Sequence, residues 1–302
     1  MQSWRKWEIG EVSIEDKQYP ESLRWIQNPP KKLFYRGNWN QEILVNCLAV
    51  VGSRRVTGYG EAVINKIIPG LVRAGLTIVS GFMSGVDSLG HQVCLDSGGK
   101  TIAVFGCGLN QLVPAGNDKL YDRILDQGGL VVSEYEKEVK ARLWTFPQRN
   151  RIVAGLSKGV LVIEGGENSG SLITAKLAKR QAKPVLAIPG PVTSSQSAGT
   201  NWLIKNGAEI VLNSDDVLKA LGMERLHSRH SRGEKIHTSG VECSEIESRI
   251  MEELSKEPLE TDDLSRKLGI DIVILSQTLS LMSLKGLVEE KSGRYYTGSN
   301  AN

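Results

Sequence analysis

The side chains that could bind a ligand are concentrated between residues 144 and 179. This stretch reads WTFPQRNRIVAGLSKGVLVIEGGENSGSLITAKLAK and combines Phe146, Arg149, Asn150 and Arg151 with a Gly/Ser turn over residues 165–171. The turn stands between a strand-like and a helix-like run, so free backbone N–H groups and the positive end of a helix dipole would meet there. Arginines pair with phosphate oxygens and a phenyl ring stacks on a base. The pattern therefore indicates a site for phosphate groups and a flat base.

Apolar runs of strand length alternate with segments of helical period from Ile43 onwards. The expected strands are Ile43–Val51, Thr77–Ser80, Thr101–Phe105, Leu130–Ser133, Val160–Glu164, Val185–Ile188 and Glu209–Leu212. The expected helices lie near Gly60–Ala74, Asp87–Ser97, Asp118–Gln127, Ile152–Ser157, Gly170–Gln181 and Gly199–Asn206. Apolar strands without polar alternation are typical of strands buried on both faces, so the pattern predicts an α/β fold with a doubly wound, parallel sheet.

Small loops rich in Gly and hydroxyl residues follow several expected strands. They contain Gly52, Ser53, Arg54 and Arg55 after the first strand, Gly81, Gly85 and Asp87 after the second, and Ser169, Gly170 and Ser171 after the fifth. Doubly wound sheets bind ligands at the carboxyl ends of their strands. One glycine-rich loop usually only permits a tight turn, but several at one edge of a sheet favour a shared anion-binding surface.

Several common functions lack their sequence signatures. The turn after the first strand does not read G-x-G-x-x-G, and no G-x-x-x-x-G-K-[ST] occurs, so neither a dinucleotide cofactor nor a P-loop is expected. The cysteines are scattered and the histidines have no metal-ligand spacing, so we expect reduced thiols and no metal. No apolar run is long enough to span a membrane and no secretory signal is present, so we expect a cytoplasmic protein. Because the dinucleotide and P-loop signatures are absent, we also expect no cofactor.

A hydrolase is also disfavoured. Asp87 and Glu164 end at the same sheet edge and His91 follows on a helix, but no nucleophile–base arrangement is legible. We expect structural roles instead: Asp87 capping its own helix, Glu164 accepting from backbone N–H groups or an arginine, and His91 capping or packing. One of Arg149 and Arg151 is expected to pair with Glu134, Glu136 or Glu164 and so to be lost to ligand binding.

The charge divides the chain unevenly. Residues 243–302 carry 7 Lys and Arg against 11 Asp and Glu, whereas residues 1–242 have a net charge of +7. The expected domains are an approach segment (1–40), a sheet domain (41–222), a linker (223–242) and a winged helix (243–302). A nucleic acid would therefore bind the sheet domain, and the acidic tail favours a protein contact over reading of a DNA groove.

At these residues the sequence strongly resembles the DprA/Smf family of bacterial DNA-processing proteins, over Tyr19 to about Leu221. The motifs that match in order include Val51-Gly52-Ser53-Arg54, Ser80-Gly81 with Gly85-Val86-Asp87 and His91, Ser133-Glu134, Phe146-Pro147 with Arg149-Asn150-Arg151-Ile152, Ser169-Gly170-Ser171 with Thr174, Pro189-Gly190, and Gly199-Thr200-Asn201. So many motifs in register make the resemblance highly specific.

The resemblance implies an extended Rossmann-like domain that binds single-stranded DNA without cleaving it, loading of the RecA recombinase on incoming strands during natural transformation, and a homodimer. A single-strand-binding protein is a further expected partner. By position, Arg54 would hold phosphate and Phe146 would contact a base. The other expected DNA contacts are Gly52, Ser53, Arg55, Gly81, Gly85, Lys140, Arg142, Arg149, Asn150, Arg151, Ser169, Gly170, Ser171 and Thr174, and Asp87, His91, Glu134 and Glu164 would support the pocket. Lys140 and Arg142 stand in for a lysine that some members carry just before the Phe.

Two alternatives stay open at this point. The phosphate-binding edge could belong to an enzyme that binds or hydrolyses a nucleotide, although residues 165–171 only echo the P-G-G-x-G-T-x-x-E signature of phosphoribohydrolases. The winged helix could belong to a ligand-sensing transcription factor, in which case duplex DNA would bind the tail.

Overall fold

The structure, a computed structural model, describes residues 6–223, 245–291 and 293–297. The chain divides into two compact units, residues 1–227 and residues 228–302. The division falls within the segment expected as a linker, most of which lies outside the described residues.

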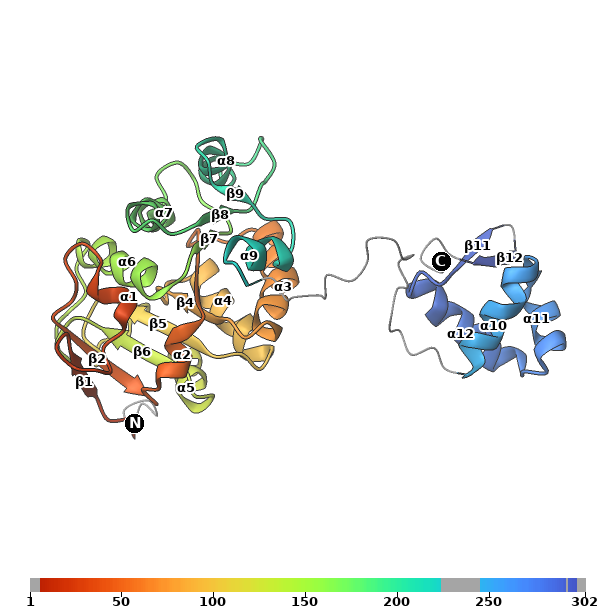
Figure 1. The fold of residues 1–302 in the computed structure, drawn as a ribbon, viewed down its shortest axis with the longest axis horizontal. Helices are drawn as coiled ribbons and strands as arrows, with labels where there is room; N and C mark the ends of the chain where they lie inside the picture. The colour runs from red at the N-terminus through yellow and green to blue at the C-terminus, as the bar shows by residue number, and fades with distance from the viewer. Residues whose placement is uncertain (1–5, 224–244, 292, 298–302) are drawn as a thin grey trace. The chain divides into compact units, whose positions relative to one another are not determined.

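The first unit is built on a nine-stranded sheet in the order β1-β2-β6-β5-β4-β3-β7-β8-β9 (Figure 1). Its strands are β1 (Gly10–Ser13), β2 (Lys32–Gly37), β3 (Cys47–Val51), β4 (Thr77–Ser80), β5 (Thr101–Phe105), β6 (Leu130–Ser133), β7 (Val160–Val162), β8 (Val185–Ala187) and β9 (Glu209–Ile210). The strands from β3 to β9 run parallel, and β1 and β2 are antiparallel at one end. This mostly parallel sheet confirms the expected α/β, Rossmann-like class.

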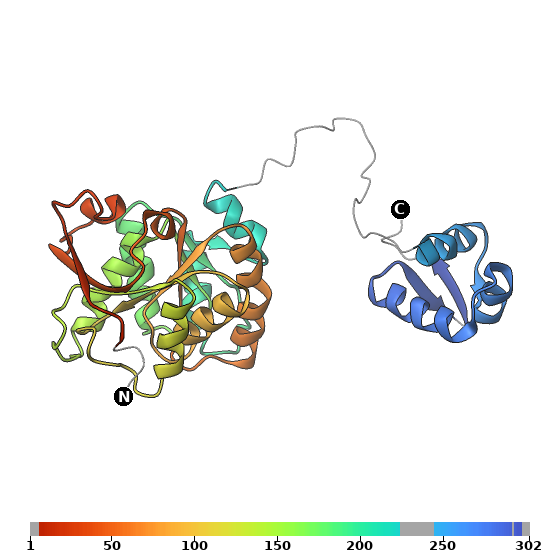
Figure 2. The ribbon, with the colours of Figure 1, turned by 90° about the horizontal axis from the view of Figure 1, so that it is seen from below.

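Helices alternate with the strands along the chain. They are α1 (Glu21–Arg24), α2 (Gln41–Val45), α3 (Gly58–Arg73), α4 (Val86–Asp96), α5 (Asp118–Asp126), α6 (Thr145–Leu156), α7 (Gly170–Arg180), α8 (Ala198–Lys205) and α9 (Ser214–Ala220). Figure 2, seen from below, shows the helices gathered around the central strands. Since β3 begins one run of strands toward β6 and β7 begins the other toward β9, the strand order reverses between β3 and β7. Ligands of doubly wound sheets bind at such a reversal.

Strand β3 shows why both faces of the sheet must be covered. Cys47, Ala49 and Val51 belong to the apolar core beneath α6 and α7, whereas Leu48 and Val50 belong to the core beneath α3 and α4. All five side chains are buried because alternate residues of a strand point to opposite faces. The run CLAVV therefore lacks the polar alternation of a half-exposed strand.

Two predicted boundaries were wrong by four residues or more. The strand expected over Ile43–Val51 begins only at Cys47, because residues 41–45 form α2, whose N-cap Asn40 accepts a hydrogen bond from the Glu42 N–H at 2.9 Å. The helix expected from Ile152 begins at Thr145, so Phe146 and Arg149 stand on the helix rather than before it. Apolar side chains at strand and helix periods look alike over so few residues.

Strands β1 and β2 and helix α9 are among the elements that had no predicted counterpart. The segment expected only to approach the sheet contributes β1 and β2, and β2 pairs with β6. Helix α9 has a capping box at Asn213 and Asp216, a signature that is visible in the sequence. The two strands widen the sheet, and neither they nor α9 lie at the edge where ligands are expected.

The second unit consists of three helices and a small sheet. Its elements are α10 (Glu245–Lys256), β10 (Leu259–Glu260), α11 (Thr261–Leu268), α12 (Ile272–Leu284), β11 (Val288–Lys291) and β12 (Arg294–Thr297). The strands pair in the order β10-β12-β11, and Leu254, Leu264, Leu275 and Leu279 are among the buried core residues. This arrangement is that of a winged helix-turn-helix. Within the described parts of both units, no helix is long and apolar enough to cross a membrane.

Candidate nucleic-acid interface

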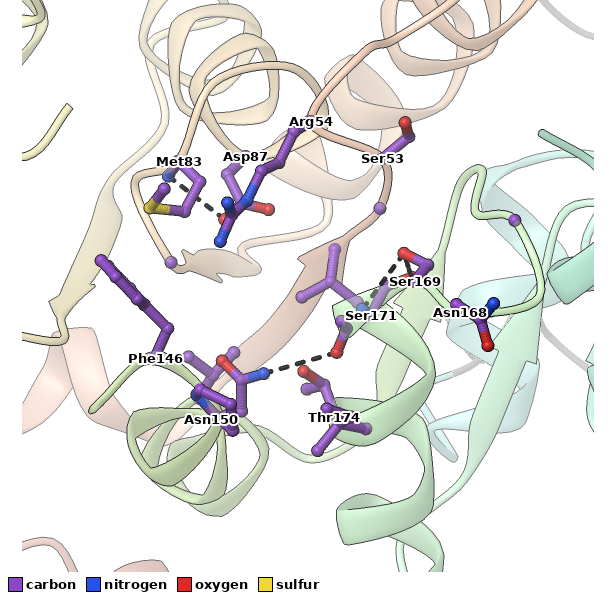
Figure 3. A pocket seen from close by; sticks show the side chains of 18 of the residues that line it. Ser53, Arg54, Met83, Asp87, Phe146, Asn150, Asn168, Ser169, Ser171 and Thr174 are labelled. Atoms are coloured by element: carbon purple, nitrogen blue, oxygen red, sulfur yellow. Dashed lines mark hydrogen bonds between the residues drawn. The ribbon is translucent and has the colours of Figure 1, made fainter. Parts of the chain in front are cut away.

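A cavity of about 640 Å³ lies at the carboxyl ends of β3, β4 and β7, at the reversal of the strand order. Four segments form most of its wall: the loop after β3, the loop after β4, helix α6, and the turn between β7 and α7 with the start of α7. Figure 3 shows Arg54, Phe146 and Asn150 projecting around one opening, with Ser169, Ser171 and Thr174 at the start of α7. The sheet therefore brings together residues that are more than 100 positions apart in the chain.

Most of the residues expected to bind a ligand line this cavity. Those that do are Gly52, Ser53, Arg54, Arg55, Gly81, Phe146, Arg149, Asn150, Ser169, Gly170, Ser171 and Thr174, together with the support residue Asp87. Those that do not are Gly85, Lys140, Arg142, Arg151, His91, Glu134 and Glu164. The cavity walls also include residues that were not predicted, namely Met83, Leu143, Pro147, Asn168, Ile173 and Gln196.

The turn before α7 presents a prepared anion site. Ser169 is the N-cap, and its hydroxyl oxygen accepts from the Ser171 N–H at 3.3 Å and lies 2.7 Å from the Ser171 hydroxyl. Asn150 donates from Nδ2 to the Gly170 carbonyl oxygen at 3.4 Å, which ties α6 to this turn. Helix α7 has no acidic residue in its first turn, so its positive end is not neutralised by its own chain. A phosphate would be stabilised there.

Arg54 and Phe146 form the opposite wall. The guanidinium carbon of Arg54 lies 5.7 Å from the centre of the Phe146 ring, within range of a cation–π contact. Arg54 is exposed, as is its neighbour Arg55, whereas Phe146 is half-buried. The pair places a positive charge and an aromatic face on one side of the opening. That combination suits an unpaired nucleotide, which offers a phosphate and a flat base.

Glycines let the loops after β3 and β4 touch. Gly85 has φ +84°, and a Cβ there would lie 2.3 Å from the Ser53 carbonyl oxygen. The Val86 N–H donates to that same oxygen at 3.1 Å. Gly85 therefore serves by fixing the backbone that carries Arg54, and any side chain at this position would both strain φ and clash.

Arg149 corrects the sequence interpretation. It was expected to contact a phosphate, but its side chain is 3% exposed and donates to the carbonyl oxygens of Gly81, at 2.7 Å, and Val104. Burial lowers the pKa of Arg149 to about 10, with the nearby Asp87 carboxylate opposing that shift. Burial likewise raises the pKa of Asp87, while Arg149 acts to lower it. Both side chains line the cavity, and their opposite charges help to hold its wall.

Asp87 also differs from its expected role. It does not cap its own helix: the N-cap of α4 is Gly85, with no side-chain cap. Instead, Asp87 Oδ2 accepts from the Met83 N–H at 3.3 Å and so holds the loop after β4. A Cβ on Gly81 would lie 2.5 Å from Arg149 Nη2 and 2.7 Å from Asp87 Oδ2, so glycine is required above this pair.

Arg151 pairs with Glu134, as one of the two arginines was expected to do. Its Nη1 and Nη2 donate to Glu134 at 3.0 and 2.6 Å, and the side chains are only 12% and 11% exposed. Because Arg149 is also engaged, both arginines of the Arg-Asn-Arg motif are used inside the protein rather than one. Asn150, between them, faces the cavity.

The remaining support residues have structural partners. Glu164 is buried and accepts from the Thr57 N–H at 3.0 Å and the Thr57 hydroxyl at 2.5 Å, which anchors the start of α3. His91 Nδ1 lies 2.6 Å from Thr101 Oγ1, and that hydroxyl donates to the Ile78 carbonyl oxygen. Since a hydroxyl has one proton, His91 must donate from Nδ1. Burial lowers the pKa of His91 to about 3, so the ring is neutral at physiological pH.

Lys140 and Arg142 are exposed but outside the cavity wall. The Arg142 carbonyl accepts from the Thr145 hydroxyl at 2.8 Å, and the Arg142 N–H donates to the same hydroxyl at 3.2 Å. The backbone there is thus fixed, and both cations flank the approach to α6. Among the described residues there is no cluster of His, Cys, Asp and Glu suited to a metal ion.

Comparisons with known proteins agree on one family. The profile described as "DNA recombination-mediator protein A" matches residues 11–222, and that of the "DprA winged helix domain" matches residues 238–294. The chain is 43% identical to DNA processing protein DprA of Streptococcus pneumoniae over 68% of this chain and 72% of that protein. It is 40% identical to protein Smf of Escherichia coli over 70% of this chain, a match that spans 56% of the longer relative.

Two solved structures share the fold. DNA processing protein A from Streptococcus pneumoniae aligns with a TM-score of 0.66 at 42% identity, over 70% of this chain and 74% of that one. The protein of the same name from Helicobacter pylori, described for its single-stranded DNA binding mode, aligns with a TM-score of 0.62 at 31% identity, over 70% of this chain and 95% of that one.

Proposed function

We propose that this chain, which belongs to the DprA/Smf family of DNA-processing proteins, binds single-stranded DNA in the cavity between β3, β4 and β7. The observation that carries the proposal is the pairing of the Arg54 cation with the Phe146 ring, opposite the positive end of α7, which has no acidic residue in its first turn. Phosphate and base would then be held on separate walls. Duplex DNA would not fit this arrangement, because its bases are stacked and their faces covered.

The expected DNA contacts are the side chains and N–H groups of the cavity that are exposed to solvent. Arg54 and Arg55 are exposed and can pair with phosphates, and the N–H groups around Ser169, Gly170 and Ser171 would hold a further phosphate. Phe146 and Asn150 would contact a base by stacking and hydrogen bonding. Lys140 and Arg142 would guide the strand toward this site by their charge.

The protein would act as a non-catalytic mediator of recombination. Asp87 is the carboxylate in the cavity wall, and its hydrogen bond from the Met83 N–H and the nearby positive charge of Arg149 leave it poorly placed to act as a general base. Loading of RecA onto the bound strand, protection of incoming DNA and a homodimer are part of the same proposal and rest on family membership. A nucleotide-hydrolysing enzyme is the rival, and release of a base from a nucleoside monophosphate would favour it.

The test is fluorescence anisotropy with labelled poly-dT and a matched duplex across a salt series. We expect tight, salt-sensitive binding to the single strand, and a loss with Arg54→Ala. Arg180→Ala is the matched control, because Arg180 is an exposed arginine on α7 outside the cavity. Equal affinity of the Arg54 and Arg180 variants would refute this site.

A further inference from the structure

Helix α12 carries an exposed apolar stripe beside its buried face. Ile274 is 49% and Leu281 is 56% exposed, while Leu275, Leu279 and Met282 on the neighbouring face are buried in the core of the second unit. In a winged helix that reads DNA, this helix would enter the major groove with basic or amide side chains. Here the stripe offers hydrocarbon to solvent, which marks a protein contact.

The spacing of the stripe is that of a helix-pairing seam. Asp271, Ile274, Thr278, Leu281 and Lys285 follow one another at intervals of three, four, three and four residues. Such alternation keeps one face of a helix toward a partner helix. The Thr278 hydroxyl donates to the Ile274 carbonyl oxygen at 2.8 Å, so it is satisfied within the helix and leaves its methyl group for packing.

The order of residues in the seam identifies the partner. The acidic residue stands at the first end and the basic residue at the last, with the apolar pair placed about Thr278. We propose that α12 pairs in antiparallel fashion with α12 of a second copy of this chain. A two-fold axis at Thr278 would set Ile274 against the partner's Leu281 and Asp271 against the partner's Lys285. A parallel pairing would oppose like charges instead.

The basic end of the seam can accept this partner. Lys285 Nζ already donates to Glu247 Oε1 at 2.7 Å, but an ammonium group has three N–H donors and Lys285 is 39% exposed. Its N–H groups can therefore serve a carboxylate of the second copy as well. Exposed Ser276, Ser280 and Ser283 lie on other faces of α12 and leave the seam uncrowded.

The pairing does not require new folding. An isolated helix of 13 residues is marginal in water, but α12 is held helical by its contacts with α10, α11 and β11. Two short seams meeting in this way bury little surface, so the contact is weak between free molecules and strengthens when two copies are held close together. The inference concerns the second unit alone and does not depend on the DNA site.

The test is site-directed cross-linking of the full chain, in a Cys243→Ser background, with a short bismaleimide. Thr278→Cys would stand on the two-fold axis, and Ser280→Cys, about 160° away around the helix, is the matched control. We expect at least about tenfold more cross-linked dimer from the first than from the second. Dimerisation through the other unit would raise both yields together, so equal yields from the two positions would overturn the proposal.

A complementary pair of variants tests whether Ile274 of one copy meets Leu281 of the other. Ile274→Lys and Leu281→Glu, each added to Thr278→Cys, should abolish cross-linking alone, because each buries a charge against an apolar partner. An equimolar mixture should restore it, since the introduced ammonium group of one copy then meets the introduced carboxylate of the other and the second Ile–Leu contact is intact. Failure of the mixture, with both variants shown to be folded by circular dichroism, would also overturn the proposal.

Discussion

The cavity of the first unit lies where doubly wound sheets bind their ligands, and helix α12 of the second is the helix with which a winged helix reads DNA, yet their surfaces differ. The cavity presents Arg54, Arg55 and the positive end of α7, whereas α12 presents Ile274 and Leu281. Position in a fold therefore does not determine the ligand. The chemistry of the exposed side chains does, and it is the basis on which we propose DNA binding by the first unit and protein binding by the second.

The largest expected effect concerns the buried charges in the cavity wall. Arg149→Met would remove the donors to the Gly81 and Val104 carbonyl oxygens and the positive charge that faces the buried Asp87, and leaving a buried charge uncompensated costs about 3–5 kcal/mol. Urea unfolding of the variant should show this loss, while Arg180→Met should unfold like the parent. If both variants were equally stable, the cavity wall would not depend on the buried Arg149.

Next in size is the effect at the cavity mouth. Arg54→Ala removes a phosphate partner and the cation over Phe146, for which we expect a loss of roughly 1.5–3 kcal/mol, or about 10- to 100-fold in affinity for poly-dT. The slope of log affinity against log salt should fall by about 1. An unchanged slope with weaker binding would mean that Arg54 supports the fold rather than holding a phosphate.

A smaller effect depends on pH. Burial depresses the pKa of His91 from 6.5 to about 3, so the folded protein binds this proton less well than the unfolded chain. The stabilising contribution is therefore complete above about pH 6.5 and declines as the pH falls toward 3, by at most about 1.4 kcal/mol per pH unit. The difference in unfolding midpoint between the parent and His91→Gln should shrink from pH 7 to pH 6 and again to pH 5. If this difference were the same at all three pH values, burial of the neutral His91 ring would not be the source of the pH dependence.

The smallest effect is expected from removing the second unit. If the acidic tail contributes no DNA contact, residues 1–223 should bind poly-dT within about twofold of the full chain in 0.15 M salt. A much larger loss would mean that α12 or the β11–β12 pair helps to hold the DNA strand, and the contrast between the two units would then be wrong.

The sheet and the location of its binding edge could be predicted from sequence because they depend on local signals. Buried strands are continuous apolar runs, and Gly and Ser at their ends mark the loops. The partners of Arg149 could not be predicted, because Gly81 directly follows β4 and Val104 lies in β5, both far from Arg149 in the sequence. Arg151 found a partner within 17 residues and was therefore easier to anticipate.

The residues of the cavity wall that were not predicted also lack a local sequence signal. Leu143 and Ile173 are apolar residues next to Trp144 and Leu172, and nothing in the neighbouring sequence distinguishes a residue that faces a ligand from one that packs in the core. Asn168 stood within the Gly/Ser turn and could have been included from its position alone. Strands β1 and β2 escaped prediction because their pairing is antiparallel and distant, while proline-rich turns dominate the surrounding sequence.

The antiparallel pairing of β2 with β6 has a consequence for synthesis of the chain. Residues 32–37 find their partner only when residues 130–133 have left the ribosome, close to a hundred residues later. At about 5–20 residues per second, the N-terminal hairpin would wait on the order of 5–20 s with one edge open. During that interval the nascent chain exposes an unpaired strand, which is the kind of surface that chaperones cover.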